Sequence, residues 1–440
     1  MNRQAVIVAV VALGAAAGCK RSSQNGTAGA ASATATAATA SSATTASTAS
    51  AAKPSKPVAS RVCHLGTAVT ATEGRGANTF GIAASTVGVA VTWGELRSGT
   101  GFGPPDAKQR FEMGRVFDAD TLAAKAAAKE VDSQEAVDAF SNGIAPFALD
   151  DGTLGAASCG WAAFAGKLSC GFTQLAAPEG KKLSASGYDD PSVAGPGPEG
   201  DRVAAAGVGD AAVMLLPQCQ EVRLVSSAGK AGVRPLAYGS ADALVSCEPK
   251  QNVEVPALAA VSATEAAAVW RHGSKLEGRL LGKDGSPHAG IVAVSAPGGD
   301  VGAPAIASSG EGAAVVYAAR TGAAPWALTL AHWKAGAPIT RATVTTGADP
   351  AMAPALVPTD EPGCMLVSWT EGKGSATHVR AGLVCNDALV TASVVDVSAS
   401  GVEAGDSELA RAASSAAYVV WQELPKGKPA ELRLAKITCD

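Results

Sequence analysis

The feature that most constrains the fold of this 440-residue chain is a short pattern that recurs along its C-terminal part. Each copy opens with a small strand, usually led by proline, and continues into a run of small residues that ends in valine and an aromatic residue. A polar turn and a third apolar run follow. The aromatic residues of the four clear copies, Trp270, Tyr317, Trp369 and Trp421, lie 47, 52 and 52 residues apart.

Weaker copies extend toward the N-terminus. The segment 88–93 fits the pattern well, 211–215 fits it loosely, and a degraded copy lies around Cys159 to Cys170. Repeats of about 40 to 50 residues with three or four short strands are typical of a β-propeller, in which each repeat forms one blade. The sequence therefore predicts an all-β propeller of about seven four-stranded blades, with six or eight also possible. Tandem β-sandwiches are the alternative, but they would need about seven strands in every 100 residues.

One segment departs from the strand pattern. Leu122, Val131 and Phe140 recur among charged residues, and this spacing predicts a small helical insertion near 120–140. Asp118 or Asp120 would cap its start. Such an insertion would decorate a loop of the propeller.

The N-terminus has the layout of a signal peptide. A short positive stretch precedes the apolar segment 5–18, which is too short for a transmembrane helix of about 20 residues and stops at Cys19. Residues 16–19, Ala-Ala-Gly-Cys, resemble the lipobox of bacterial lipoproteins, in which the cysteine is lipidated and becomes the new N-terminus. Ala16 stands where leucine is usual, so ordinary cleavage near 15–17 is the alternative.

Residues 19–57 are almost entirely Ala, Ser, Thr and Gly, with Lys and Arg near both ends. Small side chains bury too little apolar surface to offset the entropy of ordering, so this segment is predicted to be a lipid-anchored disordered linker. Its terminal charges suit either a solubilising stalk or attraction to anionic lipid headgroups. The three predicted parts are a signal peptide at 1–18, the linker at 19–57 and the propeller domain at 58–440.

The nine cysteines become an even set of eight once Cys19 is lipidated, and an even set suits disulfides outside the cytoplasm. Two pairs flank predicted hairpins, one pair joins the first strand to the last, and the remaining pair follows by elimination. The expected disulfides are Cys364–Cys385, Cys159–Cys170, Cys63–Cys439 and Cys219–Cys247. Metal binding is the alternative, but no CxxC or CxH spacing supports it.

The sequence shows no pattern that carries catalysis. The five histidines are scattered, and no nucleophile elbow, phosphate loop or paired metal ligand is present. We therefore predict no catalytic residues, no metal and no cofactor. The net charge of −4 and the lack of a basic face argue against nucleic acid as a partner.

A Trp-x-Glu triplet recurs at the end of the aromatic strand, and its acids are Glu95, Glu371 and Glu423. The period of a strand places each Glu on the same side as its Trp. The acids are possible rim ligand-binding residues, for a cation, a sugar or a basic partner. Solvated hairpin ends paired with Lys or Arg are the alternative, and His272 breaks the series after Trp270.

The lipobox-like end and the repeat rhythm resemble bacterial envelope lipoproteins that carry a propeller-type domain. The resemblance implies a protein lipid-anchored through Cys19 in the cell envelope, on the periplasmic or surface side of the outer membrane. Fold alone does not give function, and our leading hypothesis is a non-enzymatic scaffold whose propeller face binds a protein or glycan. A structural or assembly component of the envelope is a further hypothesis. The alternative is a degenerate carbohydrate-active enzyme, glycosidase- or lyase-like. A channel with two or more carboxylates and Tyr, His or Arg would favour the enzyme, whereas a channel of Ala, Val and Gly would exclude it.

Overall fold

The computed structural model describes residues 60–72, 77–98, 108–133, 141–162, 167–183, 187–190, 203–218, 221–226, 234–236, 253–286, 288–310, 312–345, 349–412 and 416–440. All of them belong to the unit Ser55–Asp440. Within these residues the chain forms strands and turns, with short 3₁₀ turns at Gly374–Ala376 and Thr391–Ser393 and no α-helix. The prediction of an all-β fold is confirmed.

The strands form seven antiparallel sheets, here called blades 1 to 7 in chain order, each of four or five strands. Blade 1 contains β3 (Ala77–Ser85), β4 (Gly88–Ser98), β5 (Lys108–Phe117) and β6 (Lys129–Ser133). Blade 2 contains β7 (Ser141–Ala148), β8 (Leu154–Ala162), β9 (Lys167–Ala176) and β10 (Gly187–Asp190). Blade 3 contains β11 (Ala204–Val208), β12 (Ala211–Gln218), β13 (Glu221–Ser226) and β14 (Arg234–Leu236).

Blade 4 contains β15 (Val253–Ala260), β16 (Glu265–His272), β17 (Lys275–Gly282) and β18 (Val292–Ala293). Blade 5 contains β19 (Asp300–Ser308), β20 (Ala313–Arg320), β21 (Ala327–Trp333) and β22 (Thr340–Thr343). Blade 6 contains β23 (Ala351–Pro358), β24 (Cys364–Glu371), β25 (His378–Cys385), β26 (Ala388–Leu389) and β27 (Val395–Asp396). Blade 7 contains β28 (Ala404–Arg411), β29 (Ala417–Glu423), β30 (Glu431–Cys439) and two N-terminal strands, β1 (Cys63–Leu65) and β2 (Val69–Thr70).

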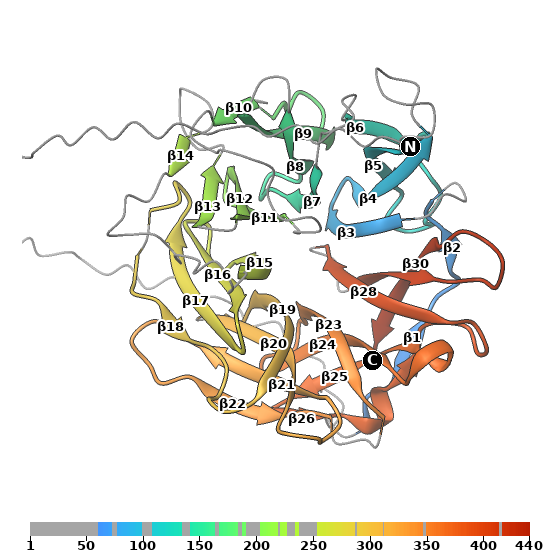
Figure 1. Cartoon of the computed structure of the whole chain (residues 1–440). Helices are drawn as coiled ribbons and strands as arrows, with labels where there is room; N and C mark the ends of the chain where they lie inside the picture. Colours follow the sequence, from blue (N-terminus) through green and yellow to red (C-terminus); the bar gives the residue numbers. More distant parts are fainter. Residues whose placement is uncertain are drawn as a thin grey trace, which may run out of the picture. The chain divides into compact units, whose positions relative to one another are not determined.

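The blades are arranged in a ring with the first strand of each blade nearest the axis (Figure 1). These inner strands contact one another in the order β3, β7, β11, β15, β19, β23, β28 and back to β3, which closes the ring. This is the arrangement of a β-propeller, as the repeat predicts.

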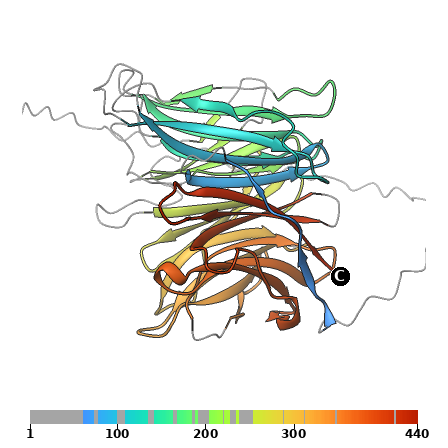
Figure 2. The same ribbon diagram turned by 90° about the vertical axis from the view of Figure 1, so that its right-hand side faces the viewer.

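The ring is closed by the two ends of the chain. β1 and β2 both pair with β30, and Cys63 lies directly opposite Cys439 in that register. Figure 2 shows the N-terminal segment running beside the C-terminal blade. Blade 7 is therefore built from both termini.

The second strand of each blade is buried on both faces, and this explains the small-residue run of the repeat. In β16, Ala268 and Trp270 pack toward blade 3, whereas Ala267 and Val269 pack toward blade 5. A strand covered on both sides has no polar face, so it reads as a continuous apolar run instead of an alternation. The apolar core therefore lies between neighbouring blades.

A β-bulge recurs at the start of the inner strand in blades 1, 2, 4, 5, 6 and 7, and it explains the leading proline. Pro256 and Pro354 lie inside the bulges of their blades, and Pro304 directly follows the bulge of blade 5. The inner strand is an edge strand, where a residue without an N–H costs no ladder hydrogen bond. Ala353 and Asp406 occupy the left-handed region there, with φ of 46° and 42°.

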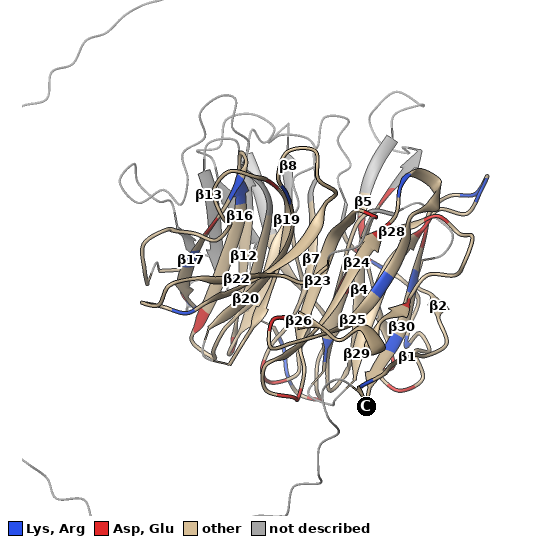
Figure 3. Ribbon diagram, turned by 90° about the horizontal axis from the view of Figure 1, so that it is seen from below, with Lys and Arg blue, Asp and Glu red and all other residues tan. Residues whose placement is uncertain are grey.

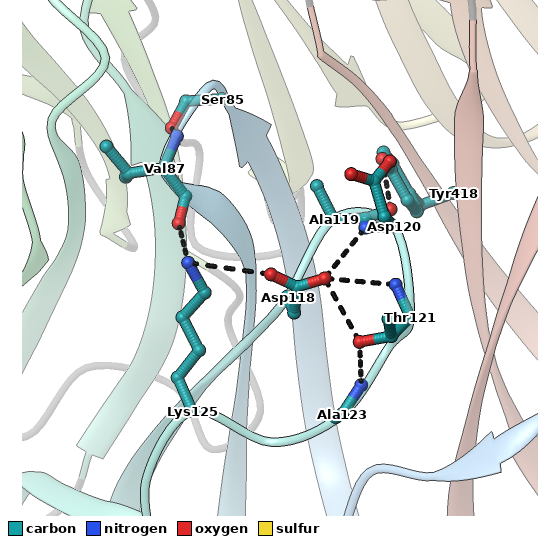
Figure 4. Close-up of polar contacts among 9 residues, drawn as sticks. All are labelled: Ser85, Val87, Asp118, Ala119, Asp120, Thr121, Ala123, Lys125 and Tyr418. Atoms are coloured by element: carbon teal, nitrogen blue, oxygen red, sulfur yellow. Dashed lines mark hydrogen bonds and ion pairs between the residues drawn. The ribbon is translucent and has the colours of Figure 1, made fainter.

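The predicted helical insertion near 120–140 is wrong for the residues that the structure describes. After Phe117 the chain makes a turn at 118–121 and then supplies β6, which pairs with β5 as the outer strand of blade 1. The Asp118 carboxylate accepts hydrogen bonds from the backbone N–H groups of Asp120 and Thr121 (Figure 4), which favours a turn. Residues 134–140 lie outside the described residues.

Candidate functional site

A cavity with a volume of about 380 Å³ lies on the axis of the propeller. The inner strands or the residues directly before them, from all seven blades, supply its walls. The lining residues are Thr79, Phe80, Gly81, Ile82, Gly143, Ile144, Ala145, Pro146, Val203, Ala204, Ala205, Pro256, Ala257, Leu258, Ala303, Pro304, Ala305, Ile306, Ala353, Pro354, Leu356, Asp406, Ser407, Glu408 and Leu409.

The wall is mostly apolar and small. The inner strands β7 and β23 contain no charged residue, and neither shows blue or red in Figure 3. The polar side chains of the lining are Thr79, Asp406, Ser407 and Glu408, and both carboxylates come from β28. Ser407 is buried and its hydroxyl lies 2.8 Å from the hydroxyl of Ser368, which joins blades 6 and 7.

The cavity meets only part of the criterion for an enzyme. It has two carboxylates, but no Tyr, His, Arg or Lys is among the described residues of its wall. Glycoside hydrolysis needs two carboxyl groups that flank the scissile bond from different sides. Asp406 and Glu408 are two residues apart on one strand, so they reach the cavity from the same wall.

The three acids of the Trp-x-Glu triplets lie beside their own tryptophans and do not line this cavity. The indole Nε1 donates to the carboxylate two residues later, at 3.3 Å for Glu95, 2.8 Å for Glu371 and 3.0 Å for Glu423. The tryptophans are almost completely buried, so each N–H requires an acceptor inside the protein.

Two of these acids also pair with an arginine of the next strand. Glu371 lies 3.3 Å from Arg380, and Glu423 lies 3.9 Å from Arg433. The residue opposite each Trp in register supplies the arginine. Ligand binding by Glu95, Glu371 and Glu423 stays a prediction, and the contacts themselves give these acids a role inside the blade.

Blade 4 contains the same cluster with its charges exchanged. His272 follows Trp270 in the acid's place, and Glu277 lies opposite Trp270 where blades 6 and 7 have arginine. His272 Nδ1 is 3.1 Å from the Glu277 carboxylate, and Lys275 Nζ is 2.6 Å from it. Burial opposes ionisation of Glu277, but hydrogen bonds from Lys275 and His272 outweigh it and lower its pKa.

The exchange leaves the Trp270 indole without its acceptor. Its Nε1 and the Nε2 of His272 are buried, and neither has a hydrogen-bond partner among the described residues. The sequence indicated that His272 interrupts the acidic series but did not indicate the exchange. The signal for the exchange was Glu277, an acid on the next strand at the position where blades 6 and 7 have arginine.

Two of the expected disulfides are present, namely Cys63–Cys439 and Cys364–Cys385. Both join residues that are directly opposite in an antiparallel register. Cys159 and Cys170 are also opposite in register, but their side chains lie outside the described part of the chain, as do Cys19, Cys219 and Cys247.

Among the described residues, no three His, Cys, Asp or Glu side chains gather as in a metal site. The same part of the chain contains no helix that is long and apolar enough to cross a membrane.

Comparison with known proteins gives neighbours at the level of fold. No protein-family model matches the chain, and no curated protein matches it. A protein of unknown function from Dyadobacter fermentans is 13% identical, with 86% of this chain and 99% of that chain covered and a TM-score of 0.47. A prolyl endopeptidase structure is 13% identical over 82% of this chain and 47% of that chain, with a TM-score of 0.48.

The α-L-arabinofuranosidase of Fusarium graminearum, solved with arabinobiose, is 12% identical over 66% of this chain and 91% of that chain, with a TM-score of 0.41. This chain spans about half the length of the prolyl endopeptidase chain. At these identities a likeness concerns the fold alone, and one fold carries many functions.

Proposed function

We propose that this chain is a membrane-anchored lipoprotein of the bacterial cell envelope whose propeller binds a protein or glycan without performing chemistry on it. The observation that carries the proposal is the lining of the axial cavity. A wall of small apolar residues with hydroxyls and carboxylates on one side favours recognition over acid–base catalysis.

The chemistry of the wall indicates which groups suit it. Asp406 and Glu408 are acceptors when ionised, and no cationic side chain is among the described residues of the wall. Groups that donate hydrogen bonds therefore fit best, such as sugar hydroxyls or the ammonium group of a lysine. The inner strands are fixed by neighbouring blades, so the cavity is formed before a ligand arrives.

Binding is tested with the purified full chain and an immobilised panel of oligosaccharides, peptidoglycan fragments and lysine-rich peptides. We expect retention of one class without product, and about tenfold weaker binding by the Asp406→Asn, Glu408→Gln double variant. Asp349→Asn, an exposed carboxylate that does not line the cavity, is the matched control. Release of reducing sugar that the double variant abolishes would contradict the proposal and favour the carbohydrate-active alternative.

The envelope location rests on the segment that ends at Cys19. Lipidation there would hold the propeller at a membrane through the linker at 19–57, with membrane lipid as the first partner. Replacing Cys19 with Ser is expected to move the protein from the membrane fraction to the soluble fraction, whereas Ser22→Ala should leave partition unchanged. Equal membrane partition of Cys19→Ser and the wild type would contradict lipidation at this residue.

A further inference from the structure

A second cavity, of about 110 Å³, lies where blades 6 and 7 meet and reaches the disulfide that closes the ring. Cys439 lines it, together with Arg61 from the N-terminal segment and Arg411 from β28. Leu366 and Ile437 are among its apolar walls. The cavity thus combines a disulfide cysteine with two guanidinium groups.

Both guanidiniums are held in place by acids of the same cavity. Arg61 Nη2 lies 2.7 Å from the Glu361 carboxylate, and Arg411 pairs with Asp360. Their side chains are only 13% and 16% exposed, and Arg61 Nε is buried without a partner among the described residues. Two guanidinium groups thus share this cavity with Cys439, and positive charge near a thiol favours its thiolate form.

The two disulfides differ in access. Cys364 and Cys385 are 4% and 3% exposed, and neither lines this cavity. Cys63 is 1% exposed, but its partner Cys439 is partly exposed and lines the cavity. A thiolate that enters the cavity meets Cys439 first, and access governs the rate of thiol–disulfide exchange.

We propose that the Cys63–Cys439 disulfide can be reduced in the folded protein, and that its reduction releases the N-terminal strap, defined as residues 61–72, from blade 7. This inference is independent of what the axial cavity binds. The reductant is a dithiol. One of its thiolates attacks Cys439 Sγ, the S–S bond breaks, and the Cys63 thiolate leaves and takes up a proton. The second thiol then displaces Cys439 as a thiol, so two electrons and two protons pass to the protein and the reductant becomes a disulfide.

Besides the disulfide, the strap is attached through the Arg61–Glu361 ion pair, through short strand pairings and through side-chain hydrogen bonds of Thr70 and Thr72. β1 is three residues long and β2 is two, and both pair only with β30 among the described strands. Backbone bonds from Ala71 to Leu432 and from Gly66 to Lys436, both 2.8 Å, hold the segment between and after them. Such short pairings are marginal in water, so the strap is expected to open once the covalent bond is gone.

The test uses the oxidised full chain under native conditions. The protein is incubated with dithiothreitol and alkylated at successive times, and each cysteine is quantified by mass spectrometry while hydrogen exchange of residues 62–72 is followed. We expect the Cys63–Cys439 bond to be reduced about tenfold faster than Cys364–Cys385 at the same dithiothreitol concentration. Faster exchange across 62–72 should accompany that first step.

Cavity access is tested with Ala417→Leu, because Ala417 lines the cavity and a larger side chain narrows it. It should slow reduction of the Cys63–Cys439 bond several-fold. Ala435→Leu, a buried alanine of the same core outside the cavity, is the matched control. If either variant does not fold, the comparison of the two disulfides in the wild-type protein tests the proposal by itself. Reduction of both bonds together, or unchanged exchange at 62–72 after reduction, would overturn the proposal.

Discussion

At the scale of single residues, the recurring Trp-x-Glu triplet is explained by one buried N–H. A tryptophan packed between two blades cannot reach water, so an acceptor must come from the blade itself. The Glu two residues later is on the same face and supplies it in three blades. The sequence shows the triplet and indicates that Trp and Glu share a face. It does not show that the Glu accepts a hydrogen bond from the indole, because that need arises only when the packed blades bury the tryptophan.

The exchanged cluster of blade 4 provides the sharpest test at this scale. The double variant His272→Glu, Glu277→Arg restores the arrangement of blade 6 and gives Trp270 Nε1 an acceptor. We expect the free energy of unfolding to rise by about 1 kcal/mol, because a buried donor without a partner costs about 1–3 kcal/mol. Chemical denaturation checks this.

The single variants serve as controls for the double variant. His272→Glu alone places two carboxylates next to each other, and Glu277→Arg alone places arginine next to His272 and Lys275, so both are expected to destabilise the protein. If the double variant is no more stable than the sum of the singles, the indole is not the reason for the triplet.

At the scale of elements, the segment after Phe117 shows why a helical pattern can fold otherwise. Its apolar spacing suits a helix, yet Leu122 enters the core between blades 7 and 1, and the next residues are needed as the outer strand of blade 1. The spacing of apolar residues within this segment carries no information about β5, which needs a pairing strand on its outer edge. The Asp118 turn was visible in the sequence only as a candidate helix cap.

The Asp118 turn makes the stability of this loop depend on pH. Hydrogen bonds from the backbone and the hydroxyl of Thr121, and from the Asp120 N–H, lower the pKa of Asp118 below its ordinary value of 3.8, although burial opposes this slightly. A group whose pKa is lower in the folded state stabilises the fold above its unfolded pKa. That contribution is lost as the pH falls below 3.8 through the folded pKa.

Asp118→Ala is therefore expected to be less stable than the wild type at pH 7, with a difference that shrinks as the pH falls through that range. Asp120→Ala is the control, because the Asp120 side chain is 92% exposed and its ion pair with Lys436 is 3.8 Å long. Urea unfolding at pH 7 and pH 3 measures both. A difference for Asp118→Ala that is the same at both pH values would mean that its carboxylate charge is not what stabilises the turn.

At the scale of the whole molecule, the ring could be predicted because its units repeat, and its closure could be predicted because Cys63 and Cys439 are in the first and last strands. The axial cavity could not be predicted. Which residues line it depends on the bulge at the start of each inner strand, which shifts the register there. Ala353 and Asp406 have positive φ angles at these bulges, and the residues around them in the sequence do not predict this conformation.

The two disulfides allow the contribution of ring closure to be separated from that of core packing. All four cysteines pack in or against the same core between blades 6 and 7, so removing either bond disturbs similar surroundings. The two bonds differ in the length of the loop that each closes, because the sequence separation is 376 for Cys63–Cys439 and 21 for Cys364–Cys385. In the chain-entropy description, stabilisation grows with the logarithm of that length, to about 6 and about 3 kcal/mol respectively.

Replacing Cys63 and Cys439 with Ala is therefore expected to lower the free energy of unfolding by about 2–3 kcal/mol more than replacing Cys364 and Cys385. Guanidinium unfolding of the two double variants, beside the oxidised wild type, measures the difference. The ring should still close in both variants, because the inner strand β28 contacts β23 on one side and β3 on the other without the strap. Equal losses would mean that the ends of the chain are already held together in the unfolded state, or that the local hairpin bond stabilises its blade beyond chain entropy.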